Sequence, residues 1–102
     1  MSPDQRELVY TDAAIDDLEE ILAWSIQEWG EDHFIRFRQE LVSAIRSLVH
    51  QPELGLERND LAPGIRILHV APHRVIYLAN DDRVEIIRVI HQRRDLRRID
   101  WQ

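Results

Sequence analysis

Residues 11–30 have the sequence TDAAIDDLEEILAWSIQEWG, and this stretch decides the fold. Its apolar side chains recur at steps of three and four residues, which places them along one broad stripe of an α-helix. The stripe consists of Ala14, Ile15, Leu18, Ile21, Leu22, Ile26 and Trp29. Thr11 suits the amino-terminal cap, and Gly30 is a typical residue just beyond a helix carboxyl end. The stretch therefore predicts an amphipathic helix between Thr11 and Gly30.

A second helical pattern begins directly after Gly30 and runs from about Glu31 to His50. Pro52 ends it, because proline disfavours helical geometry in the residue that precedes it. Since Gly30 leaves almost no linker, the two helices must form an antiparallel hairpin. The apolar stripe of the second helix consists of Phe34, Phe37, Leu41, Ala44, Ile45 and Leu48.

Short strand patterns flank this hairpin. One precedes it at residues 6–10, and three follow a loop at residues 52–64. The later patterns are Ile65–Val70, Arg74–Ala79 and Val84–His91, with turn residues between them that suit antiparallel connections. The order β-α-α-β-β-β predicts an α+β fold of two layers, in which the helical hairpin packs on one face of an antiparallel sheet.

The last two strand patterns are apolar on both faces. Val84, Ile86 and Ile90 would share one face of the last strand, with Ile87 and Val89 on the other; in the strand before it, Ile76 and Leu78 oppose Val75 and Tyr77. Two helices cover only one face of a sheet, and an exposed apolar surface usually marks a partner site. We therefore expect a protein partner on the second face. The alternative is that the loop and the carboxyl-terminal tail fold back over it.

Length and composition restrict the class of protein. The chain has 102 residues, enough for a single domain over residues 1–102. It has no cysteine and no lysine, which excludes disulfides, thiolate catalysis, cysteine-based zinc sites and a catalytic lysine. No apolar run approaches the ~20 residues of a membrane span, and no signal core begins the chain. We expect a cytoplasmic protein with no cofactor, metal or membrane partner.

Charge is distributed unevenly along the chain. The formal net charge is −6, yet residues 61–102 carry 8 arginines against 5 acidic residues. Residues 92–102 form a basic tail that could stay flexible. Its arginines, at spacings of three and four, would be gathered on one side by a short helix; they are Arg93, Arg94, Arg97 and Arg98. This predicts a basic patch for an acidic partner, the alternative being a solvated tail balanced by Asp95 and Asp100.

Five fragments along the chain match a known family in order and spacing. They comprise Tyr10-Thr11 with Ala14, Asp17-Leu18, Ile21, Trp24 and Trp29-Gly30; Pro52-Glu53-Leu54-Gly55 with Arg58; Gly64-Ile65-Arg66; His73-Arg74-Val75-Ile76-Tyr77; and Ile87 to Asp95. Together they resemble the ParE toxins of the RelE/ParE superfamily, over roughly residues 8–96.

This resemblance implies a RelE-like fold and the toxin role in a type II toxin–antitoxin system. Toxins of the ParE family are understood to inhibit DNA gyrase and to be neutralised by a ParD-like antitoxin with a ribbon-helix-helix end. We therefore expect these two partners, a toxin–antitoxin hetero-oligomer, no direct binding of nucleic acid and no side-chain catalysis. The alternatives are a RelE-like ribosome-dependent mRNA endoribonuclease and a non-toxic protein-binding domain of the same fold.

Candidate site residues follow from these expectations. The four tail arginines are the candidates for binding the target. The candidates for binding the antitoxin are Trp24, Arg66, Val75, Tyr77 and Arg88. Trp24 falls off the main helical stripe, so it either packs at the hairpin edge or is exposed at an interface. Arg66 and Arg88 lie within strands and could instead pair with Glu85 or other neighbours.

RNA cleavage would need a different set of residues. The candidates are His91, Arg66 and Arg93, of which only His91 has a suitable unperturbed pKa. The RelE-like pattern usually has lysines on the second helix, and this chain has none. His91 is otherwise expected to be a strand-end histidine that makes a structural hydrogen bond.

Overall fold

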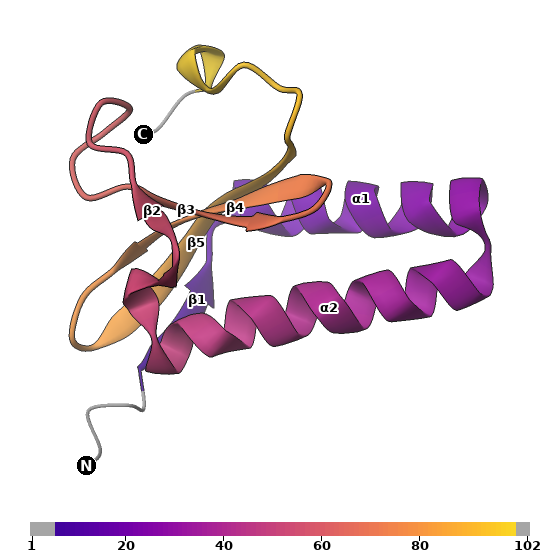
Figure 1. Cartoon of the computed structure of the whole chain (residues 1–102), viewed down its shortest axis with the longest axis horizontal. Coiled ribbons are helices and arrows are strands. Elements are labelled where there is room, and N and C mark those ends of the chain that lie inside the picture. Colours follow the sequence, from indigo (N-terminus) through magenta and orange to yellow (C-terminus); the bar gives the residue numbers. More distant parts are fainter. Residues whose placement is uncertain (1–5, 100–102) are drawn as a thin grey trace.

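A helical hairpin and a five-stranded sheet form the two layers of the structure, a computed structural model that describes residues 6–99 (Figure 1). The elements are β1 (Glu7–Tyr10), α1 (Asp12–Trp29), α2 (Glu31–His50), the 3₁₀ turn η1 (Pro52–Leu54), β2 (Leu56–Glu57), β3 (Arg66–Val70), β4 (His73–Ala79), β5 (Arg83–His91) and the 3₁₀ turn η2 (Leu96–Arg98). The strand order in the sheet is β1-β5-β4-β3-β2. This arrangement confirms the predicted two-layer α+β fold.

The predicted helix ends are confirmed by local contacts. Thr11 Oγ1 accepts a hydrogen bond from the Ala14 amide at 3.0 Å, which caps α1. At the other end Gly30 has φ 82°, a left-handed conformation that glycine adopts without steric cost, and α2 begins at the next residue. The two helices consequently run antiparallel with almost no linker.

The sheet is mixed, whereas we expected antiparallel strands throughout. Strands β3, β4 and β5 form the predicted antiparallel meander, but β1 pairs with β5 in parallel. Parallel neighbours need a long connection, and here it runs through the helical hairpin and then through β2, β3 and β4 before the chain reaches β5. The loop at residues 52–64 also contains β2, an edge strand of two residues that is too short to give an alternating pattern.

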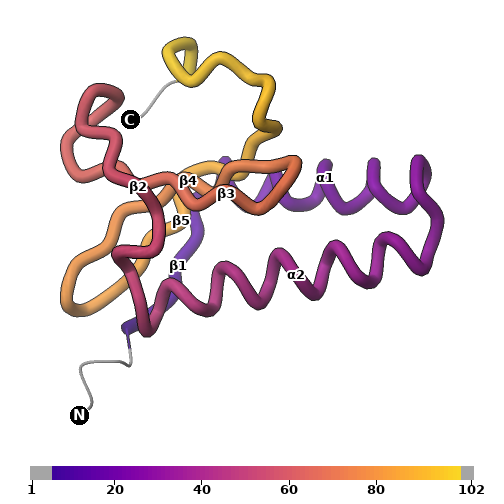
Figure 2. The backbone as a smooth tube through the Cα atoms, viewed as in Figure 1, coloured from indigo at the N-terminus to yellow at the C-terminus, as the bar shows by residue number. Residues whose placement is uncertain are grey.

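Two apolar cores lie on opposite faces of the sheet. The helix-side core contains Ala14, Phe37, Leu41, Ile45, Leu48, Val75, Tyr77, Val84, Ile86 and Val89. The far-side core contains Ile65, Ile76, Ile90, Leu96 and Ile99. The loop before β3 and the tail thus fold back over the second sheet face, on the side away from the helices (Figure 2). The expectation that a partner covers this face is therefore wrong for its buried part.

A β-bulge explains why two residues face opposite to the predicted direction. The pairing between β4 and β5 shifts by one residue, because Ile76 is opposite Arg88 while Tyr77 is opposite Ile86. Ile87 is the extra residue, and an extra residue reverses the alternation beyond it. Val89 consequently joins the helix-side core and Ile90 the far-side core.

Candidate protein-binding surfaces

Arg88 is held by an ion pair inside the chain. Its Nε lies 2.7 Å from Asp17 Oδ2 and its Nη2 lies 2.9 Å from Asp17 Oδ1, and Asp17 Oδ2 also accepts the Val89 amide at 3.0 Å. The hydrogen bonds to Asp17 raise the pKa of Arg88 further above its usual range. The partner of Arg88 is therefore Asp17 rather than Glu85. The pair fastens α1 to β5, which leaves Arg88 little capacity to bind an antitoxin.

Val75 and Tyr77 have no exposed surface. Their side chains belong to the helix-side core, so the expectation that they contact an antitoxin is corrected. The Tyr77 hydroxyl donates to the Pro52 carbonyl at 2.5 Å and accepts from the Gly55 amide at 2.8 Å. A Cβ at position 55 would lie 2.6 Å from this hydroxyl, so only glycine fits. Tyr77 therefore fixes the loop after α2.

Arg66 supports the same loop. Its Nη1 donates to the Gly55 carbonyl at 2.6 Å, and its Nη2 lies 3.4 Å from Glu57 Oε1. The side chain is partly buried, since 26% of it is exposed. These contacts give Arg66 a structural role within the chain.

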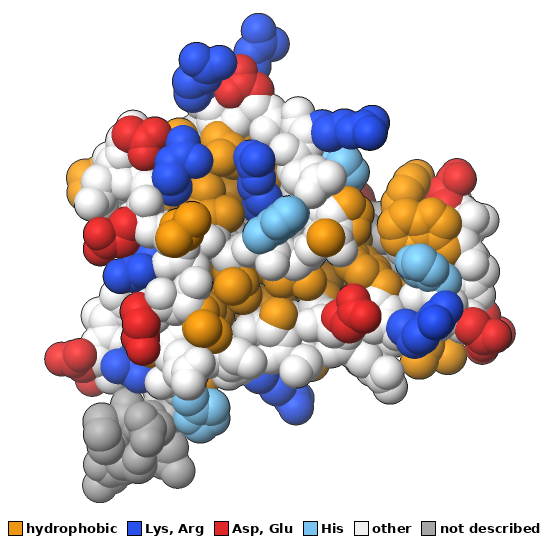
Figure 3. Space-filling model, in the orientation of Figure 1, with side chains coloured by type: hydrophobic (Ala, Val, Ile, Leu, Met, Phe, Trp, Pro, Cys, Tyr) orange, Lys and Arg blue, Asp and Glu red, His pale blue; other side chains and the backbone are white. Residues whose placement is uncertain are grey.

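Trp24 packs at the hairpin edge and is also partly exposed, so both alternatives predicted for it hold in part. Its ring packs edge-on against Trp29 at a centroid distance of 4.8 Å, yet 45% of the residue remains exposed. Trp29 in turn contacts His33 and Phe37 on α2. Hydrophobic side chains gather at this end of the hairpin, on the right of Figure 3. Trp24 is thus the one antitoxin candidate with a large free apolar surface.

Further apolar side chains of the hairpin are partly exposed, although the sequence patterns did not identify them as surface residues. Ile15 and Ile26 on α1, and Ile35 and Val42 on α2, are each exposed by 37–44%. Residues seven or eleven positions apart share one face of a helix. Each helix therefore has a partly exposed apolar row beside its buried stripe.

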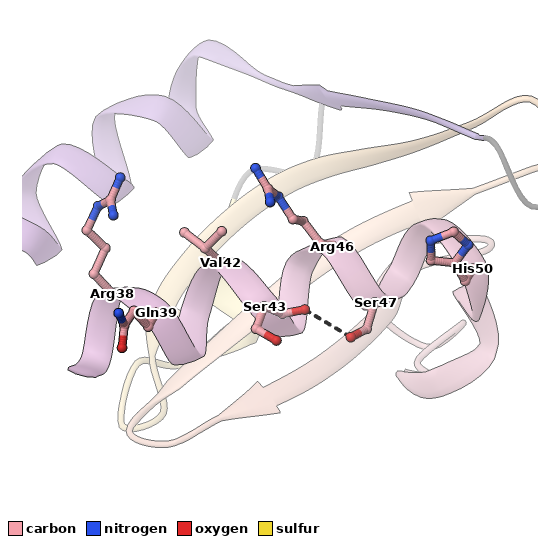
Figure 4. A pocket seen from close by; sticks show the side chains of 7 residues that line it. All are labelled: Arg38, Gln39, Val42, Ser43, Arg46, Ser47 and His50. Atoms are coloured by element: carbon pink, nitrogen blue, oxygen red, sulfur yellow. Dashed lines mark hydrogen bonds between the residues drawn. The ribbon is translucent and has the colours of Figure 1, made fainter. Parts of the chain in front are cut away.

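A shallow groove of about 470 Å³ runs along the outer face of α2 (Figure 4). Its lining comprises Arg38, Gln39, Val42, Ser43, Arg46, Ser47 and His50. Figure 4 shows Arg38, Val42 and Arg46 projecting from α2 toward the side of the view where α1 lies. Sequence reasoning missed this groove, because polar residues outside an apolar stripe resemble an ordinary solvated face.

The tail arginines are exposed but do not lie on one helix. Arg93 and Arg94 lie in a turn after β5, and only Arg97 and Arg98 belong to η2. Asp95 accepts the Arg97 amide at 3.0 Å and also pairs with the Arg97 and Arg98 side chains. That amide hydrogen bond lowers the pKa of Asp95. The expected gathering by a short helix is therefore corrected; Asp100 lies outside the described residues.

The tail is anchored rather than free between residues 96 and 99. Leu96 and Ile99 are 7% and 6% exposed because they pack in the far-side core. Basic side chains protrude at the top of Figure 3, where Figure 1 places η2. The packing of Leu96 and Ile99 therefore holds the neighbouring arginines at a fixed place on the surface.

Of the three candidates for RNA cleavage, Arg93 lies beside His91, but Arg66 does not. Arg66 is opposite Tyr77 on β4, whereas His91 is opposite His73, four residues away on the same strand. Four residues along a strand and two strand spacings separate Arg66 from His91 by about 16 Å. His91 Nδ1 accepts the Arg93 amide at 3.1 Å, which confirms the predicted structural hydrogen bond.

His73 is a buried titratable group. Its ring lies between Phe37 and His91, at centroid distances of 5.4 and 5.5 Å, and is 4% exposed. Among the described residues its Nδ1 has no hydrogen-bond partner. Burial lowers the pKa of His73, and the nearby charge of His91 lowers it further.

Residues 6–99 contain neither a cluster of metal ligands nor a helix suited to a bilayer. Within them no three histidine, aspartate or glutamate side chains lie close enough to hold a metal ion together. None of the helices found there is both long and apolar enough to cross a bilayer.

Comparison with known proteins places the sequence beside bacterial toxins. The family model described as the ParE toxin of the type II toxin–antitoxin system parDE matches residues 8–96. Toxin ParE1 of Mycobacterium tuberculosis is 32% identical over 82 residues, which cover 79% of this chain and 84% of that protein. Toxin ParE1 of Caulobacter vibrioides is 36% identical over 76 residues, which cover 74% of this chain and 78% of that protein.

Solved structures share the fold. A chain of the chromosomal ParDE TA system from P. aeruginosa superposes with a TM-score of 0.71 at 21% identity, covering 86% of this chain and 97% of that one. A chain of the E. coli DinJ-YafQ toxin-antitoxin complex gives a TM-score of 0.53 at 16% identity, covering 86% and 93%. These likenesses confirm the expected RelE-like fold.

Proposed function

The chain belongs to the ParE toxin family of type II toxin–antitoxin systems, and from this premise we propose that it inhibits DNA gyrase and is neutralised by a ParD-like antitoxin. The observation that carries the proposal is the presence of two separate exposed surfaces of different chemistry. One is the arginine-bearing tail on the far side of the sheet, and the other is the apolar helical hairpin (Figure 1). A toxin needs one surface for its target and one for its antitoxin.

The tail supplies the proposed target surface. Arg93, Arg94, Arg97 and Arg98 are all exposed, and η2 holds the last two in place. Arginine offers a planar fork of donors that matches carboxylates. An acidic patch on the target would be steered toward these charges and oriented by them.

The hairpin supplies the proposed antitoxin surface. Trp24 combines a large apolar ring with exposure, and tryptophan is enriched at the energetic centres of interfaces. The exposed rows on α1 and α2 extend this surface along the helices. A segment of the antitoxin that is disordered when free would fold on the hairpin, giving a toxin–antitoxin hetero-oligomer in the cytoplasm.

Catalysis is not part of the proposal. Of the cations expected to bind the phosphate in RNA cleavage, only Arg93 is beside His91, because Arg66 lies two strands away. Net negative charge also opposes entry into an RNA-rich site.

Expression of the chain alone in a bacterium tests the proposal. We expect arrested division, filamentous cells and induction of the DNA-damage response, because a poisoned gyrase leaves broken DNA. Co-expression of a ParD-like antitoxin should restore growth. Cleavage of ribosome-bound mRNA with no DNA-damage response would favour the RelE-like alternative, and normal growth would favour a non-toxic binding domain.

A further inference from the structure

The groove along α2 is lined by two arginines. Arg38 and Arg46 border the groove described above, and none of its lining residues is acidic. The five ion pairs found within residues 6–99 engage other arginines. Arg38 and Arg46 take part in none of these pairs, so their charges remain available to an anionic partner.

The strip has a defined spacing. Arg38, Val42 and Arg46 are four residues apart, so they follow one another along the same side of α2 (Figure 4). At 1.5 Å per residue the two arginines are about 12 Å apart along the helix axis. A partner complementary to the two arginines would carry two carboxylates at the same spacing, with another side chain midway between them.

That middle position is apolar. Val42 lies between the two arginines and is 37% exposed, and Ile35, seven residues earlier, is 44% exposed. An apolar side chain flanked by cations suits neither a nucleic acid backbone nor a simple anion, because both would leave Val42 against a charged group. It suits a protein segment in which an apolar side chain lies between acidic ones.

We propose that the α2 groove, formed by Arg38, Val42 and Arg46, binds an acidic amphipathic helix whose apolar side chain on Val42 is flanked by carboxylates one turn away on each side. This inference rests on the proposed function, because the helix is assigned to the antitoxin. A partner helix repeats its side chains every 3.6 residues, as α2 does, so carboxylates eight residues apart reach both arginines. The groove would thereby specify the charge pattern of the neutralising segment.

Charge reversal with a matched control tests the proposal. Wild type and the variants Arg38→Glu, Arg46→Glu and Arg83→Glu are titrated by calorimetry with the ParD-like antitoxin that restores growth on co-expression. Arg83 is an exposed arginine at the start of β5, outside the helical hairpin. We expect each of the two groove substitutions to weaken binding by about tenfold and the control by much less. Arginine substitutions at the matching acidic positions of the partner should restore binding to the groove variants.

A second readout does not depend on charge. The chain has no cysteine, so Val42→Cys introduces a unique thiol for an environment-sensitive fluorophore, with Arg83→Cys as the control. The emission of the label at position 42 should shift to the blue when the partner is added, and that of the label at position 83 should shift less.

The outcomes separate the inference from the function that it rests on. Wild-type binding with equal affinities for all three charge variants and no shift at position 42 would overturn the groove and leave the antitoxin in place. Absence of wild-type binding would overturn both. Binding of a double-stranded DNA probe that is lost in Arg38→Glu would also overturn the proposal, in favour of a nucleic acid surface.

Discussion

At the scale of single residues, Asp17 joins the helical layer directly to the sheet. It accepts two hydrogen bonds from Arg88 and one from the Val89 amide, while only 12% of its side chain is exposed. The sequence placed Asp17 in a family-like motif but did not identify its partner. Arg88 is 71 positions away, and only the crossover through the hairpin brings the two together.

Substitution of Asp17 by Asn should reduce stability markedly. The neutral amide leaves the mostly buried Arg88 guanidinium without its counter-charge, and loss of one member of a buried pair costs about 3 kcal/mol. Urea unfolding measures the change, with Asp16→Asn as an exposed control on the same helix. Equal stability of the two variants would contradict the structural role of the pair.

His73 should make the fold sensitive to acid. Its pKa is lowered in the folded state, so below its unfolded value of about 6.5 the unfolded chain binds more protons than the folded one. Its contribution to stability is complete above that pH and is lost as the pH falls toward the folded-state pKa. His73→Phe removes this titration, so its free energy of unfolding should fall less than that of wild type between pH 7 and pH 5. Parallel curves for the two proteins would contradict the assignment.

At the scale of elements, both helices and the three-stranded meander could be predicted because their signals are local. Gly30 and the apolar stripes needed no distant partner. The bulge at Ile87 could not be predicted, because it depends on a contact across the chain: Thr11 Oγ1 donates to the Ile87 carbonyl at 2.7 Å. Two strand residues were assigned to the wrong faces for this reason, and Val75 and Tyr77 were assigned to a surface although the helices bury them.

The tail element should separate toxicity from stability. Replacing its four arginines by glutamine removes exposed charges, and surface changes of this kind usually alter stability by no more than ~0.5 kcal/mol each. We expect toxicity to fall while antitoxin binding and the melting temperature are retained. The control is Leu96→Ala, which leaves the arginines in place but should cost about 2–3 kcal/mol, since it opens a cavity in the far-side core. If the glutamine variant is as toxic as wild type, the tail arginines do not bind the target.

At the scale of the whole molecule, the sheet separates two surfaces. The helices and their exposed apolar rows lie on one side, and the anchored tail with its arginines lies on the other (Figure 2). The resemblance of the sequence predicted the fold and the family correctly. It could not predict which candidate residues remain at the surface, because the helices bury Val75 and Tyr77 on one sheet face while the loop and the tail cover the other face.

The supercoiling activity of purified DNA gyrase, titrated with the purified chain, tests the central claim most directly. Our account predicts that supercoiling falls as the chain is added, that cleaved DNA accumulates, and that prior addition of the antitoxin prevents both effects. The glutamine variant of the tail should inhibit weakly, while Arg38→Glu should inhibit like wild type but require about tenfold more antitoxin for protection. Full supercoiling at a large excess of folded chain, together with cleavage of ribosome-bound mRNA, would contradict the account.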